Sequence, residues 1–131
     1  MKKIILFSLI IFSIQITIAQ NRTIDGGEFT GNVHWSGRIL IRGDVTIASS
    51  CRLVIEPGTR IIFEPNTDVR KSGIDKTRSE LIVRGVLIAR GRAGEKITFT
   101  SSAGSPRMAD WYGIEFLHVK SQSIIEYCII E

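Results

Sequence analysis

The side chains that could do chemistry gather in two polar stretches of the sequence, residues 65–78 and 102–110. Both stretches interrupt runs of apolar residues, and loops on a rigid scaffold are where binding sites usually lie. They carry several basic residues, and an aromatic pair follows the second stretch directly. Flat aromatic rings beside polar groups are typical of sugar-binding surfaces. The candidate contacts to a glycan or other surface partner are Arg70, Lys71, Lys76, Arg78, Arg107, Asp110, Trp111 and Tyr112.

An alternative for both stretches is that they are tolerated insertions with solvated charges, since repeat scaffolds place insertions in loops with or without a ligand. Two further aromatic residues are assigned to packing. Trp35 is expected to cover the N-terminal end of the core, and Tyr127, which alternates with Ile125 and Ile129, is expected to pack.

Catalytic chemistry has less support. A calcium-dependent polysaccharide lyase needs clustered carboxylates, and Asp68, Asp75 and Asp110 could meet only if the two stretches fold together. Calcium takes about six or more oxygen ligands, which these three residues alone do not supply. A glycosidase needs two acids about 5 to 10 Å apart. Glu115 and Glu126 lie in expected strands, and the sequence does not fix their separation.

Other catalytic and metal-binding patterns are absent from the sequence. His34 and His118 lack a partner at metal-ligand spacing. There is no nucleophile elbow, phosphate-binding loop or dinucleotide fingerprint. We therefore predict no catalytic, cofactor-binding or metal-ligating residue. Calcium is kept as an alternative, because it is the one ion that the loop carboxylates could bind.

Short apolar triplets with a period of two recur along the chain, and glycines mark the bends between them. No stretch repeats apolar residues at helical spacing for long. One triplet cannot bury its apolar side alone, so stacking each on its counterpart would pair the backbones and line one core. The triplets are 45–47, 53–55 and 61–63, then 81–83, 86–88 and 97–99, with a third round at 113–116 and 123–130.

This pattern predicts an all-β fold with three strands per turn, a stacked solenoid. If the strands correspond from turn to turn, the stretches 65–78 and 102–110 leave at the same corner of adjacent turns and form one patch. A β-sandwich is the alternative, because it also has many short strands. Sandwich strands commonly reverse through Asn-Gly or Asp-Gly hairpins, and the apolar runs are not joined by such pairs. The Pro57-Gly58 pair suits a bend.

Several longer motifs share one pattern: Trp35-Ser36-Gly37, residues 41–47 and 53–59, residues 81–91 with 97–101, residues 111–114, and residues 123–127. Together they resemble secreted bacterial repeat proteins with a pectin-lyase-like fold. The resemblance implies a right-handed parallel β-helix, a single-stranded β-solenoid of about three turns over residues 45–131. Residues 20–44 would form its leader and cap. Because such proteins are often several hundred residues long, we expect this solenoid to be incomplete at its C-terminus.

Residues 1–19 have the features of a secretory signal peptide: Lys2 and Lys3, an apolar stretch over 4–19, and a small residue at the Ala19–Gln20 junction. A membrane anchor is the alternative, but a spanning helix needs about 20 apolar residues. We predict export to the cell surface, periplasm or extracellular space, with no membrane span after cleavage. The formal net charge of +4 includes the two leader lysines, so the weakly basic remainder does not indicate a nucleic-acid partner.

Cys51 and Cys128 are the only cysteines. Export allows a disulfide, but two cysteines make no dense framework, and thiols that pack as small apolar groups are favoured. The apolar segment 123–131 has little to cap it, so the sequence also predicts association end to end through this edge.

Taken together, the residues predict an exported structural or adhesive module that contacts glycans or a surface partner through its corner loops. The alternative is the N-terminal part of a polysaccharide lyase or glycoside hydrolase whose catalytic turns lie beyond residue 131.

Overall fold

The computed structural model describes residues 21–118 and 122–131, so the predicted signal peptide lies outside the described residues. The described residues form strands and turns without a helix, and accordingly none of their elements is a helix that could cross a membrane. The strands are β1 (Asn21–Ile24), β2 (Gly27–Trp35), β3 (Arg38–Ile41), β4 (Val45–Ile55), β5 (Arg60–Phe63), β6 (Glu80–Val83), β7 (Val86–Arg90), β8 (Ile97–Ser101), β9 (Gly113–Phe116), β10 (Ile124–Glu126) and β11 (Cys128–Ile130).

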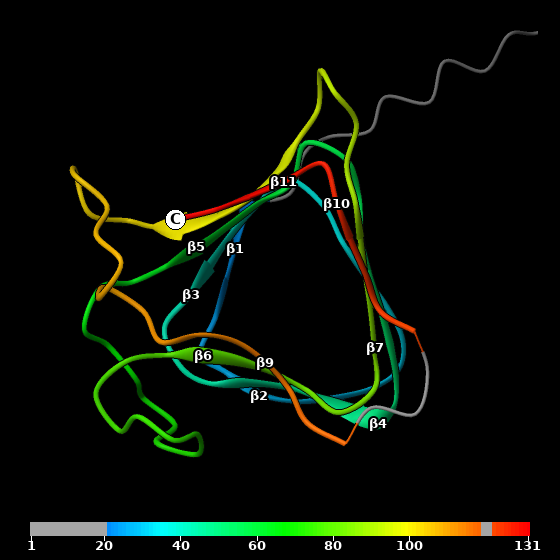
Figure 1. Cartoon of the computed structure of the whole chain (residues 1–131). Helices are drawn as coiled ribbons and strands as arrows, with labels where there is room; N and C mark the ends of the chain where they lie inside the picture. The colour runs from blue at the N-terminus through cyan, green and yellow to red at the C-terminus, as the bar shows by residue number, and fades with distance from the viewer. Residues whose placement is uncertain (1–20, 119–121) are drawn as a thin grey trace, which may run out of the picture.

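The strands form two sheets around one core (Figure 1). The five-stranded sheet has the order β1-β3-β5-β8-β11. The six-stranded sheet has the order β10-β7-β4-β6-β9, and β2 also pairs with β4. All these strand pairs are parallel. In Figure 1 the five-stranded sheet forms one side of the molecule and the six-stranded sheet curls around the other two.

The predicted right-handed single-stranded parallel β-helix of about three turns is therefore wrong: the chain forms two parallel sheets, and one of them curls into a half-barrel. The reason lies in β4. The triplets 45–47 and 53–55 were expected on separate strands, but the backbone stays extended between them and β4 runs from Val45 to Ile55. Because β6 pairs with its first part and β7 with its second part, two expected sides merge into one sheet.

The core lies between the sheets and takes alternate residues of most strands. In the five-stranded sheet Ile39 pairs with Ile61, and Ile61 pairs with Phe99 in the next strand. These side chains are fully buried. Each burial contributes about 1.5 to 3 kcal/mol relative to exposure. Trp35 is also fully buried, and the Arg22 guanidinium lies 5.6 Å from its ring centre, so this end of the core is covered as expected.

Gly85 marks the tight bend between β6 and β7. A Cβ at this position would lie 2.2 Å from the carbonyl oxygens of both Ala48 and Cys51, and neither backbone oxygen can move freely. We expect Gly85→Ala to lower the free energy of unfolding by roughly 1 to 3 kcal/mol through overpacking. Gly94→Ala is the matched control, because that position has open space around it. Urea unfolding of both variants tests this, and equal stabilities would contradict the bend geometry.

Candidate functional site

The two polar stretches form loops that lie side by side. The first loop (residues 65–78) joins β5 to β6, and the second loop (residues 102–110) joins β8 to β9. Because β5 pairs with β8 and β6 pairs with β9, both loops cross between the sheets at the same corner on adjacent layers. The Asn66 N–H donates to the Asp110 carbonyl oxygen at 2.9 Å. The strand correspondence thus brings the loops together, as the sequence pattern predicts.

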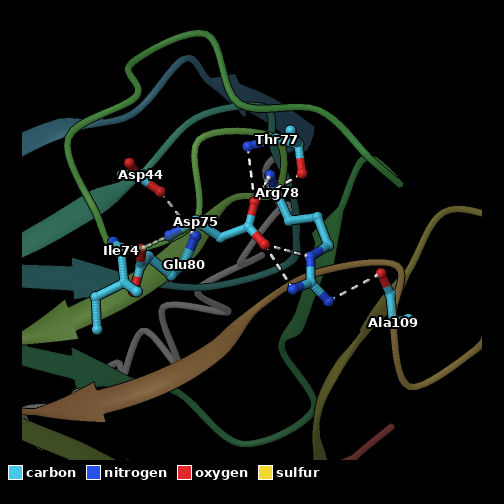
Figure 2. Close-up of polar contacts among 7 residues, drawn as sticks. All are labelled: Asp44, Ile74, Asp75, Thr77, Arg78, Glu80 and Ala109. Atoms are coloured by element: carbon cyan, nitrogen blue, oxygen red, sulfur yellow. Dashed lines mark hydrogen bonds and ion pairs between the residues drawn. The ribbon is translucent and has the colours of Figure 1, made fainter.

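Asp44, directly before β4, holds the first loop against the six-stranded sheet, and Figure 2 shows its contact with Glu80. Its Oδ2 accepts the N–H groups of Ser72 and Gly73 at 2.8 and 2.6 Å and the Ser72 hydroxyl at 3.1 Å. Its Oδ1 accepts the Glu80 N–H at 3.0 Å. Asp44 is almost fully buried, so these donors satisfy a carboxylate that water does not reach.

Glu80, the first residue of β6, makes a second attachment to the same loop. Its Oε1 accepts the backbone N–H groups of Ile74 and Asp75, the latter at 3.3 Å. Gly73 lies so close that a Cβ there would overlap the Glu80 side chain, so the loop approaches this carboxyl with a glycine. Burial first, and then the neighbouring Glu115 carboxyl, raise the pKa of Glu80 to about 7.

Asp75 and Arg78 fix the far end of the first loop. Asp75 Oδ2 pairs with the Arg78 Nε at 2.9 Å and Nη2 at 2.6 Å, while its Oδ1 accepts the Thr77 hydroxyl at 2.7 Å (Figure 2). The Thr77 hydroxyl and the Arg78 guanidinium hold the pKa of Asp75 well below its usual range. Arg78 in turn donates to the Ala109 carbonyl oxygen at 3.4 Å and lies 5.5 Å from the centre of the Tyr112 ring. The Asp75–Arg78 pair therefore sets the position of Tyr112 at the seam between the loops.

Of the eight candidate contacts, Lys71, Lys76, Arg107 and Tyr112 are exposed and Arg78 is half-buried. Lys76 donates its Nζ to the Lys71 and Gly73 carbonyl oxygens, which folds its stem back over the loop.

Arg70 is exposed but serves to anchor the first loop. Its Nε and Nη2 donate to the carbonyl oxygens of Asp25 and Gly26 at 3.0 and 3.4 Å. These bonds tie the loop to the turn between β1 and β2.

Asp110 and Trp111 correct the expectation, because both are buried. The Trp111 ring stacks on Phe63 with centroids 4.1 Å apart, and its Nε1 donates to the Glu131 carbonyl oxygen at 2.9 Å. Asp110 accepts the Arg107 N–H at 3.0 Å, and the Ser101 hydroxyl is the largest cause of its lowered pKa. These two side chains hold the second loop in place and are almost fully buried.

The two acids considered for glycosidase chemistry are not a pair. Glu126 forms an ion pair with Arg90 at 3.1 Å on β7. Glu115 lies instead on β9 as a diagonal neighbour of Glu80 on β6, and its carboxyl contributes, after burial, to the raised pKa of Glu80. Glu80 is also fully buried beneath the first loop. The arrangement does not favour sugar hydrolysis at this point.

The remaining candidate groups are placed as follows. Over the described ranges, no three histidine, cysteine or carboxylate side chains are arranged to hold a metal ion. Cys51 is buried and Cys128 half-buried; both are free thiols, and burial raises the pKa of each. Tyr127, expected to pack, is exposed instead and adopts a positive φ of 50° between β10 and β11.

Sequence reasoning missed Asp44 and Glu80. Their only sequence signal is that each carboxylate directly precedes an apolar triplet, at the start of a strand. Their partners are backbone N–H groups, which every residue type except proline carries. The loop sequence therefore contains no pattern that indicates these two attachments.

Searches of protein-family models, curated proteins and solved structures found no match to the chain.

Proposed function

We propose that the protein is an exported adhesive module whose two loops bind acidic polysaccharide. One observation carries the proposal: Arg78, fixed by Asp75, supports the exposed ring of Tyr112 where the two loops meet. A ring held in this way is preorganised, so stacking on a sugar ring costs little conformational entropy. Because Asp75 neutralises Arg78, any net positive charge of the site comes from the other basic residues of the loops.

The charges of the two loops favour an acidic ligand over a neutral one. The loops contain five basic and three acidic residues. All three acids are engaged: Asp68 and Asp110 are buried and accept backbone N–H groups, and Asp75 is paired with Arg78. The exposed ammonium groups of Lys71 and Lys76 and the guanidinium of Arg107 therefore dominate the unpaired charge of the two loops. Uronate carboxylates or sulfate groups would complement these charges.

Tyr112→Ala should weaken binding of acidic oligosaccharides about tenfold, a loss of roughly 1.4 kcal/mol, because it removes the stacking face. The matched control is Tyr127→Ala, which removes a similarly exposed tyrosine from the turn between β10 and β11 and should leave affinity unchanged. Isothermal titration with oligogalacturonate and oligomannuronate, against neutral cello-oligosaccharide, measures both effects.

Reversing charge in Lys71→Glu with Arg107→Glu should also weaken binding and reduce its salt dependence. Equal binding of acidic and neutral oligosaccharides, or equal loss in the Tyr112 and Tyr127 variants, would contradict the proposal.

A further inference from the structure

We propose that Glu80 and Glu115 share one proton beneath the loops, and that this proton makes the binding of acidic polysaccharide depend on pH. The ligand in this inference rests on the proposed function, whereas the proton pair is tested without any ligand.

The pairing of β6 and β9 brings the two glutamates together. Glu80 lies opposite Gly113, and Glu115 lies opposite Ile82, so the two glutamates are diagonal neighbours on adjacent strands. Leu81, between Glu80 and Ile82, belongs to the core, so the glutamates point to the outer face that the first loop covers. The Glu115 carboxyl is also, after burial, a cause of the raised pKa of Glu80.

Each carboxyl has one buried oxygen that lacks a donor. These are Glu80 Oε2 and Glu115 Oε2. Two ionised carboxylates are both acceptors, so neither can satisfy the other. One proton turns one of them into a donor, which removes the like-charge contact and completes a hydrogen bond between them. A buried acceptor without a donor is costly, so the shared proton is the state that the geometry favours.

The surrounding charges act in the same direction. Asp44 packs against Glu80 from the start of β4, and its negative charge adds to burial and to Glu115 in raising the pKa of Glu80 to about 7. The N–H groups of Ile74 and Asp75 oppose this rise. The charged residues of the first loop are Asp68, Arg70, Lys71, Asp75, Lys76 and Arg78. Asp75 and Arg78 neutralise each other, while Arg70 and Lys76 donate to backbone oxygens.

The pair lies beneath the proposed binding surface. Glu80 follows Arg78 by two residues and Glu115 follows Tyr112 by three, on strands that begin side by side. Loss of the proton adds a negative charge under the cationic loops. It also sets two like charges against each other on β6 and β9, the strands that follow Arg78 and Tyr112 in the sequence. Both effects weaken the binding of an acidic ligand as the pH rises through about 7.

The first test uses no ligand. Carboxyl carbon NMR of glutamate-labelled protein should show one glutamate titrating near pH 7 in the wild type, and this titration should be absent in Glu80→Gln. Glutamine keeps an acceptor for the Ile74 and Asp75 N–H groups and supplies a donor to Glu115. If Glu80→Gln does not fold, the wild-type titration decides alone. Ordinary titration of every glutamate below pH 5.5 would overturn the inference, as would a shift of the curve by calcium.

Stability gives a second ligand-free readout. The folded state holds the proton more tightly than the unfolded chain, so the wild type should lose stability relative to Glu80→Gln as the pH rises from about 4.5 to about 7. Glu126→Gln is the control, since Glu126 lies exposed beside Arg90. If the free energy of unfolding of the wild type and of Glu80→Gln changes equally with pH, the shared proton is contradicted.

The second test measures binding. Affinity for oligogalacturonate, whose carboxylates stay ionised throughout, should fall several-fold between pH 6 and 8 in the wild type and in Glu126→Gln. Glu80→Gln should show no such fall. The same fall in Glu80→Gln would overturn the pH inference and leave the proposed function standing. Absence of binding at every pH would remove the proposed function, while the carboxyl titration would still decide the proton pair.

Discussion

Asp44→Ala is expected to lower the free energy of unfolding by about 3 to 5 kcal/mol. The substitution removes the acceptor for three backbone N–H groups, those of Ser72, Gly73 and Glu80, and for the Ser72 hydroxyl. The Glu80 N–H is buried at the β4–β6 junction and would be left without a partner. Chemical unfolding of the full chain measures the loss.

Two controls separate this attachment from ordinary surface charge. Asp44→Asn keeps one acceptor oxygen and should cost less than alanine. Asp25→Ala removes an exposed carboxylate whose ion pair with Arg42 is 2.7 Å long, and should cost about 1 kcal/mol or less. Equal losses for Asp44→Ala and Asp25→Ala would mean that the first loop does not depend on Asp44.

Release of the first loop is a separate readout of the same variant. Lys71 and Lys76 are exposed sites for trypsin within the loop, and in the folded protein the Asp44 bonds hold the backbone beside them. Asp44→Ala should therefore be cleaved in this loop faster than the wild type under native conditions. Unchanged cleavage would show that Glu80 and Arg70 suffice to hold the loop.

The strands were the most predictable part of the structure, because alternation of apolar residues reports which side chains are buried. The triplets 81–83, 86–88 and 97–99 each lie within an observed strand. The prediction failed at residues 48–51, where a bend between two strands was expected and the single strand β4 continues instead. Ala48 and Cys51 are buried while the two serines between them are exposed, so the period of two is broken there. That break resembles a corner in the sequence, whereas the structure keeps the backbone extended beside the irregular pairing at Phe29 and Gly31 of β2.

The meeting of the two loops was also predictable, since it follows from which strands correspond. The burial of Trp111 was not, because a residue between a loop and a strand has no alternation to reveal its direction. Its ring continues the core by stacking on Phe63, the last residue of β5. The attachments of Asp44 and Glu80 depend on the path of the loop backbone, which side-chain types do not encode.

The layer formed by β9, β10 and β11 exposes core-facing side chains. Phe116 lies opposite Val83 and Ile130 lies opposite Phe99, so all four face the core. Val83 and Phe99 are fully buried, whereas Phe116 and Ile130 are 40% and 53% exposed. The difference has a simple cause: among the described strands, none pairs with the outer edges of β9 and β11. An apolar layer with unpaired strand edges is prone to association.

We expect a second copy of the chain to cover this layer, through a twofold contact in which the same surface meets itself. Ile130→Lys would place a charge in that contact and should weaken association at least about tenfold. Ile129→Lys is the matched control: Ile129 lies opposite Thr98 on the outer face of the five-stranded sheet, so its lysine can reach water. Sedimentation velocity over a concentration series should show wild type and Ile129→Lys associating at concentrations where Ile130→Lys is a monomer. A wild type that stays monomeric at the highest concentrations, or equal effects of the two lysines, would mean that a second copy does not cover this layer.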